Sequence, residues 1–160
     1  MVWKTPRTWT AGELVTALLL NEQLRDNLAA LKDPPTKVVA GTGNRTTTAT
    51  DWDAVDEQYY NHTITTSGGA VLIVLSGAVS STAGTTACFD VMIDGVRQAF
   101  SANGLIYFTA NAGQVVPFTM IHLAQNLAPG EHAFMPVWKT TTGTLVLQGG
   151  ANQFWVREIS

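Results

Sequence analysis

The sequence predicts a mainly β protein, an antiparallel jelly-roll sandwich preceded by an N-terminal arm and one α-helix. Three observations lead to this fold class. From Lys37 onward the chain is rich in Val, Ile, Thr and aromatic residues, which favour strands. Turn dipeptides such as Asp94-Gly95 interrupt this region at short intervals. Only the segment before Pro35 has apolar residues at a helical spacing.

The chain begins with an arm that contains two tryptophans, Trp3 and Trp9, on either side of Pro6. Large indole side chains are costly to leave in water. We therefore expect both to insert into an apolar environment, either the body of the chain itself or a docking site on a larger assembly.

A heptad pattern follows the arm. Its core positions are Leu14, Asn21 and Leu28 at a, and Ala17, Leu24 and Leu31 at d. Thr10 and Glu13 are spaced as a capping box, and Thr16 is a rival N-cap. Pro34 biases the preceding residue away from helical angles, so the helix should end there.

Such a short helix is marginal alone in water and needs a partner surface. One interpretation is an amphipathic helix packed on its own domain. The other is a short bundle between identical chains, with Asn21 fixing the register. In the bundle, leucines outside the seam would face a further partner. The residues predicted to attach or oligomerise the chain are Trp3, Trp9, Leu14, Leu18, Leu20, Asn21, Leu24, Leu28 and Leu31.

Ten short segments have strand composition. They are 38–40, 45–49, 59–65, 71–79, 87–93, 96–101, 115–124, 132–139, 144–148 and 153–158. In the fifth, Phe89, Val91 and Ile93 should point one way and Asp90 the other. Asp94-Gly95 should form a tight hairpin turn. Because proline cannot donate to a ladder, Pro117 and Pro136 should lie on edge strands or at bulges.

The run from Ala70 to Leu75 is apolar on both faces, whereas a sandwich strand normally has one wet face. An identical neighbour is the simplest cover for the second face. Only 13% of the residues are charged, against roughly 25% in an ordinary soluble domain, which also indicates a covered surface. The predicted trimer interface comprises Leu72, Ile73 and Val74.

Composition argues against several other classes of protein. The net charge of -3, without a run of Lys or Arg, makes nucleic acid an unsuitable partner. The start of the chain lacks the apolar region of a signal peptide, and no apolar run is long enough to span a bilayer. We expect a soluble protein made in a cytoplasm. Cys88, the single cysteine, should be an inert buried thiol.

No catalytic set can be assembled from the sequence. His62, His122 and His132 are far apart, each inside a predicted strand, so we expect neither an enzyme nor a cofactor. Alternate carboxylates at Asp51, Asp53 and Asp56 are weak candidates for a calcium site, but the segment lacks the glycine and distal glutamate of a calcium loop. A solvated turn with Trp52 pointing inward is the preferred interpretation.

Several segments resemble a known group of proteins. The segment 9–17, with Leu20-Asn21 and 24–28, resembles the N-terminal signature of a group of bacteriophage and prophage virion proteins. The ending 154–159 resembles the ends of those chains. Their β-domain is similar to the segments 89–91, 94–96 and 127–132 with Trp138. That domain is in turn similar to the tumour-necrosis-factor-like and complement-head jelly rolls, which are trimers.

The resemblance implies a homotrimeric structural protein of the virion, made in the host cytoplasm. Residues 1–35 would attach it to other virion proteins, and residues 36–160 would form an outward head. The appendage could be a tail fibre, a tail tip, or a head fibre or decoration; on a tail, the head would touch a host glycan or protein. The alternative is a carbohydrate-binding, lectin-like module for host recognition. Its stacking platforms would be Trp52, Trp138, Tyr59, Tyr60 and Tyr107. Most of these rings alternate with apolar neighbours, so a place in the core or in an interface is the preferred interpretation.

Overall fold

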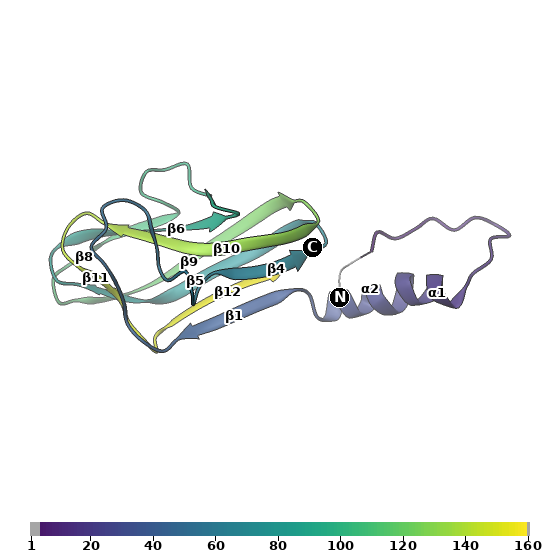
Figure 1. Cartoon of the computed structure of the whole chain (residues 1–160), viewed down its shortest axis with the longest axis horizontal. Helices are drawn as coiled ribbons and strands as arrows, with labels where there is room; N and C mark the ends of the chain where they lie inside the picture. The colour runs from purple at the N-terminus through teal and green to yellow at the C-terminus, as the bar shows by residue number, and fades with distance from the viewer. Residues whose placement is uncertain (1–3, 160) are drawn as a thin grey trace.

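A computed structural model describes residues 4–159. Helical segments precede two antiparallel sheets that face each other and form a jelly-roll sandwich, so the predicted fold class is confirmed (Figure 1). The helical segments are α1 (Ala17–Leu20), the π-helical η1 (Asn21–Asp26) and α2 (Asn27–Lys32). Within the described residues, no helix has the length and apolar character needed to cross a membrane.

The strands are short at the start and longer in the middle of the chain. They are β1 (Thr36–Gly41), β2 (Arg45–Thr47), β3 (Asp53–Ala54), β4 (His62–Thr66), β5 (Gly69–Ser81), β6 (Thr85–Ile93), β7 (Val96–Arg97), β8 (Ile106–Ala110), β9 (Val115–Leu127), β10 (Gly130–Thr140), β11 (Leu145–Leu147) and β12 (Asn152–Glu158). One sheet has the order β1-β12-β5-β11-β2, with β9 on the other side of β5. The second has the order β3-β10-β6-β7, with β4 beside β10 and β8 beside β6.

The core lies between the sheets and is rich in aromatic rings. Phe89 of β6 stacks on Phe118 of β9, with ring centroids 4.3 Å apart, and Trp138 of β10 is fully buried beside them. As predicted, Phe89, Val91 and Ile93 share one face of the strand, and the structure shows that this face is buried in the core. Burying one such side chain is worth about 1.5–3 kcal/mol, so the alternation along these strands largely determines the fold.

The helix begins later than the heptad pattern predicts. The rival N-cap is the one used, because the Leu19 N–H donates to Thr16 Oγ1 over 3.2 Å. Glu13 does reach back to the Thr10 N–H, at 3.3 Å, but this contact closes an isolated turn before the helix. Leu14 therefore lies outside the helix, and the wider π-helical turn interrupts the repeat after it. The predicted continuous seam from Leu14 to Leu31 is wrong for these two reasons.

The arm before the helix folds back along it. Lys4 N–H donates to the Asn27 side chain at 2.8 Å, and the Asn27 amide donates to the Lys4 carbonyl at 2.9 Å. Closer to the N-terminal end of the helix, Arg7 N–H donates to Gln23 Oε1. The arm therefore covers an amide-bearing side of the helix. Trp9 is exposed beneath the guanidinium of Arg7, while Trp3 lies outside the described residues.

The strand predictions fail mainly around β6. The predicted strand 96–101 shortens to β7 because the chain then turns over the outer face of the sheet, and β8 was not predicted. In that turn Arg97 pairs with the fully buried Asp90 at 2.8 Å, and the Ala99 N–H donates to the same carboxylate. The hairpin at Asp94-Gly95 is confirmed, with positive φ at both positions.

The two strand prolines have different positions. Pro117 lies on β9, which pairs only with β5 in the described structure and is an edge strand, as predicted. Pro136 lies inside the central strand β10, so the prediction of an edge or bulge is wrong there. It is tolerated because the β4 ladder ends at Phe134 and the β3 ladder begins at Val137. The missing N–H therefore faces a gap between two short partners.

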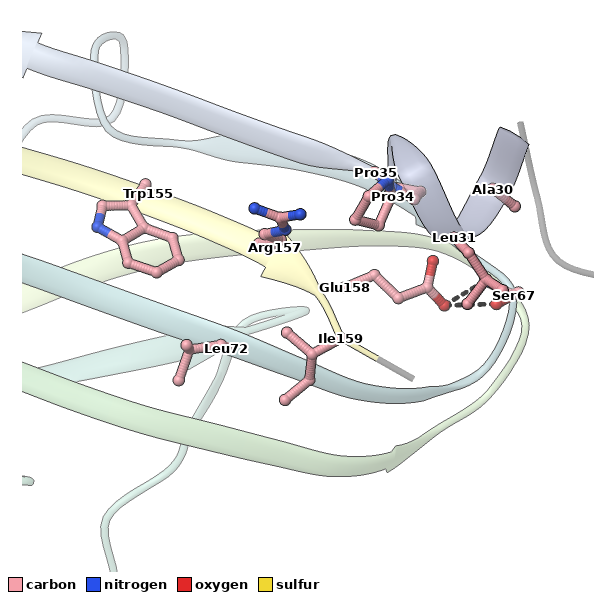
Figure 2. A pocket seen from close by; sticks show the side chains of 10 residues that line it. All are labelled: Ala30, Leu31, Pro34, Pro35, Ser67, Leu72, Trp155, Arg157, Glu158 and Ile159. Atoms are coloured by element: carbon pink, nitrogen blue, oxygen red, sulfur yellow. Dashed lines mark hydrogen bonds between the residues drawn. The ribbon is translucent and has the colours of Figure 1, made fainter. Parts of the chain in front are cut away.

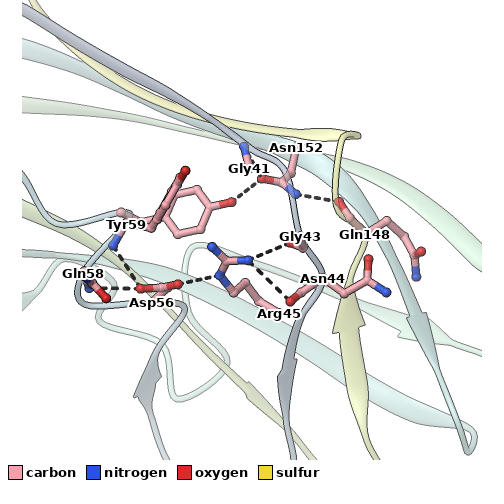
Figure 3. Close-up of polar contacts among 10 residues, drawn as sticks. Gly41, Gly43, Asn44, Arg45, Asp56, Gln58, Tyr59, Gln148 and Asn152 are labelled. Atoms are coloured by element: carbon pink, nitrogen blue, oxygen red, sulfur yellow. Dashed lines mark hydrogen bonds and ion pairs between the residues drawn. The ribbon is translucent and has the colours of Figure 1, made fainter.

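A polar cluster closes the end of the sandwich distant from the helix (Figure 3). The buried Asn152 side chain accepts from the Tyr60 hydroxyl and from the Gly41 N–H, and donates to the Gln148 carbonyl at 2.5 Å. It joins the end of β1 and the segment before β4 to the start of β12. Beside it, Arg45 pairs with Asp56 at 2.5 Å.

Replacing Asn152 with alanine should strongly destabilise the head. The change leaves the Tyr60 hydroxyl and the Gly41 N–H buried without their acceptor, which should cost about 3 kcal/mol. Urea unfolding at fixed protein concentration measures the loss. The control, Gln153→Ala, alters the exposed neighbour and should stay within about 0.5 kcal/mol of the parent. Equal losses in the two variants would contradict this role for Asn152.

Candidate functional site: an apolar sheet face and the pocket beside the helix

An outward apolar face spans four strands of the first sheet; its flanking strands carry exposed side chains, whereas Val74 in the middle is only 7% exposed. One cross-strand row comprises Val38 of β1, Trp155 of β12, Val74 of β5 and Ile121 of β9. The next row places Leu72 between Arg157 and Leu123. Ile121 is 64% exposed and Leu123 is 42% exposed. Apolar side chains that meet across strands in this way form one patch rather than scattered surface residues.

The structure corrects one residue of the predicted interface. Ile73 is 0% exposed and points into the sandwich core, while its neighbours Leu72 and Val74 point to the outer face. Successive side chains of a strand face opposite ways, so these three residues cannot share one surface. Leu72 and Val74 remain interface candidates, and Ile73 is a core residue.

A pocket of about 690 Å³ lies where α2 meets this sheet face (Figure 2). Its lining is mainly apolar, with three polar residues: Ala30, Leu31, Pro34, Pro35, Ser67, Leu72, Trp155, Arg157, Glu158 and Ile159. Glu158 Oε1 accepts from the Ser67 N–H at 2.8 Å and from the Ser67 hydroxyl at 2.6 Å. The Glu158 N–H donates to the Pro35 carbonyl. These contacts tie the linker, the end of β12 and the turn before β5 into one wall.

The helix projects from one end of the sandwich instead of lying across it (Figure 1). The alternative of a helix packed on its own domain is therefore not what the structure shows. Only Asn27 and Ala30 are buried among its residues. The predicted attachment leucines are all between 43% and 79% exposed, and Asn21 is exposed as well: Leu14, Leu18, Leu20, Leu24, Leu28 and Leu31.

The structure does not bring the carboxylates of the acidic segment together. Asp56 is paired with Arg45; burial raises the pKa of Asp56, but the hydrogen bonds from Arg45 and from the Tyr59 N–H outweigh burial, so it lies below its usual value. Asp53 accepts from the Ala54 N–H, and Asp51 is exposed. Residues 4–159 contain no group of three or more His, Cys, Asp or Glu side chains placed to hold a metal ion.

The proposed stacking platforms divide into buried and accessible rings. Trp138 and Tyr60 are fully buried and cannot contact a sugar. Trp52 is half-buried, with Arg97 4.1 Å and Lys139 5.0 Å from its ring. Tyr107 is 58% exposed, and Tyr59 is also exposed but lies against Arg45. Sequence reasoning missed the exposed Phe100, because its place in a predicted strand suggested a packed residue.

The histidines and the cysteine have separate environments. Burial lowers the pKa of His62, whose Nε2 has no hydrogen-bond partner in the described structure and whose ring stacks on Phe154. Burial likewise lowers the pKa of His122. The hydrogen bond to Asp94, 2.7 Å long, raises the pKa of His132. Cys88 is buried as predicted, and burial raises its thiol pKa.

No family model matches the sequence, and no curated protein matches it significantly. Among solved structures, the chain is similar to the Eiger TNF of S. frugiperda (10% identity, TM-score 0.48, covering 80% of this chain and 94% of that one). It is also similar to a carbohydrate-binding module of Cellvibrio mixtus lichenase 5A (23% identity, TM-score 0.34, covering 75% of this chain and 88% of that one). A third similarity is to the structure of infectious bursal disease virus, Gx strain (11% identity, TM-score 0.43, covering 80% of this chain and 38% of that one). These low identities and scores carry no information about ligands or partners.

Acidification should destabilise the head through His62. Because its folded pKa is lowered, the unfolded chain takes up the proton first, and stability is lost as pH falls below the ordinary value of about 6.5. His62→Phe should therefore lose less stability than the parent between pH 7.5 and pH 5, measured by urea unfolding.

His132 supplies a control of opposite sign. Its raised pKa contributes stability that is present below about pH 6.5 and is lost as pH rises through the folded pKa. His132→Gln should therefore lose more stability on acidification than the parent. If His62→Phe shows the same acid sensitivity as the parent, the buried imidazole is not the responsible group.

Proposed function

We propose that this chain is a structural virion protein of a bacteriophage, a homotrimeric appendage with an outward β head. Residues 1–35 join it to other virion proteins, as a tail fibre, a tail tip, or a head fibre or decoration. The observation that carries the proposal is the continuity of uncovered apolar surface from the helix, through the pocket, onto the sheet face. The resemblance of the N-terminal segment to phage virion proteins supports the choice of assembly.

A single protomer exposes apolar side chains on both the sheet and the helix. Val38, Ile121 and Leu123 on the sheet and the leucines of the helix are all exposed in a single protomer. Patches of this kind in soluble proteins mark interaction sites. Covering the sheet face requires a partner with a matching apolar surface at the same place, and an identical chain has one. The leucines of the helix would be covered by a second partner, the virus particle.

Ile121→Asp should dissociate the assembly while the fold persists. Ile121 is 64% exposed on the outer face beside Val74, so an added carboxylate stays hydrated in the monomer but would be buried in the trimer. Light scattering should show the mass falling to one third. Ile73→Asp is the contrasting variant; it puts a charge into the core and should unfold the chain. An Ile121→Asp protein that keeps the parent's mass, or a monomeric parent, would remove the sheet face from the proposal.

Attachment is tested by a truncated chain that begins at Thr36. It retains every strand and both ends of the sandwich, so it should remain soluble and β-rich by circular dichroism. Supplied to a phage lacking the gene, it should fail to join virions, because the arm and the exposed leucines are gone. The full chain, supplied in the same way, is the control. Normal incorporation of the truncated chain would place attachment in the head instead.

A lectin-like module is the second candidate, favoured by the exposed ring of Tyr107 on the outer face of the other sheet. Aromatic faces of this kind can stack on sugars, although Trp138 and Tyr60 are not available for it. An array of bacterial glycans separates the two candidates. Strong binding that Tyr107→Ala removes would favour the lectin-like function.

A further inference from the structure

The pocket beside the helix has walls from two parts of the chain. Leu31 belongs to α2, whereas Leu72, Trp155 and Ile159 belong to the head. Figure 2 shows these side chains around the opening, with Glu158 turned toward Ser67. Leu31 and Ile159 of its walls are 66% and 52% exposed, so apolar surface of the pocket is uncovered in a single protomer.

The polar groups of the pocket favour an apolar occupant. The carboxylate of Glu158 is occupied by two donors of Ser67, at 2.8 and 2.6 Å. Arg157 is exposed and lies on the outer face of the sheet, where its guanidinium reaches water. An apolar side chain can therefore enter without leaving a buried charge unpaired.

A matching projection lies on the same sheet. Strand β9 is an edge strand, and it exposes Ile121 and Leu123 on the outer face. Leu123 pairs directly with Leu72, a residue of the pocket wall. The projection and the pocket therefore lie at the same level along the strands, one strand apart.

Rotational symmetry would bring the projection of one copy beside the pocket of the next. The helix and the strands run roughly along one long axis (Figure 1). If the helices and the heads of identical chains associate together, the rotation axis must run the same way, and rotation leaves each residue at its own level. The β9 edge of one copy then faces the pocket of the next. Two different surfaces that meet in this way do not form a two-fold dimer; when the rotation closes, as in a trimer, they form a ring.

We propose that Leu123 of a second copy fills the pocket between α2 and β12. The inference rests on the self-assembly proposed above and names the contact that it uses. Because the inserted side chain contacts Leu31 of the helix and Trp155 of the head, it fixes the angle between the two. The attachment segment is then held rigidly to the head only in the assembled protein.

A disulfide tests the contact directly. The chain carries Leu31→Cys and Leu123→Cys in a Cys88→Ala background, which removes the natural thiol. Leu31 and Leu123 are exposed in one protomer, so the substitutions leave the fold intact, as circular dichroism will show. Mild oxidation should give covalent dimers and trimers on a non-reducing denaturing gel, since a disulfide needs Cα atoms within about 7 Å.

The matched control carries Leu31→Cys with Val115→Cys. Val115 is an exposed residue of the same edge strand, eight positions from Leu123 and thus about 27 Å away. We expect at least a tenfold smaller cross-linked fraction than for Leu123. A protein that light scattering shows to be trimeric, but that cross-links no more than this control or only within one chain, would overturn the pocket contact and leave the trimer standing. A monomeric parent would overturn both proposals.

Discussion

Strand β5 has apolar side chains on both faces, and most of the structure depends on where each face is buried. Val71, Ile73 and Leu75 point into the sandwich and are fully buried, so they hold the two sheets together. Leu72 and Val74 point outward, beside β12 and β9. Neighbouring side chains cover most of this outer face, and Val74 is only 7% exposed. The apolar surface that remains uncovered lies on the flanking strands, at Val38, Ile121 and Leu123, and it is the basis of the assembly proposed above.

The junction between the helix and the head determines which surfaces of the two are uncovered. Pro34 ends the helix, and the Pro35 carbonyl accepts from Glu158 at the end of β12, so the first and last strands are joined beside the linker. The arm covers the amide side of the helix through Gln23 and Asn27 and leaves the leucines uncovered. Uncovered surface therefore runs from the helix to the sheet without interruption. In the proposed assembly, the virion would contact the helix and identical chains would contact the sheet face.

The candidate site could be predicted only in outline. The apolar run from Ala70 to Leu75 indicated a covered second face, but it did not tell which residues point outward, since a shift of one residue in register exchanges the faces. The sequence also did not show which aromatic residues are exposed. Trp138 and Tyr107 have similar alternating neighbours, yet one is fully buried and the other is exposed, because Trp138 pairs with Phe89 on the core face and Tyr107 pairs with Cys88 on the outer face. The pocket has no local signal, since its walls come from four separate segments.

By itself, the sequence determined the fold class, the hairpin at Asp94-Gly95 and the inward alternation from Phe89 to Ile93, because these depend on backbone preferences and on neighbours close in the chain. The tertiary structure decided where the helix begins, that Ile73 is a core residue, and that Asp90 is buried beneath the turn after β7. Each of these depends on which distant segment covers a given side chain. Burial of that kind is a property of the packed sheets, and a local pattern of residues does not contain it.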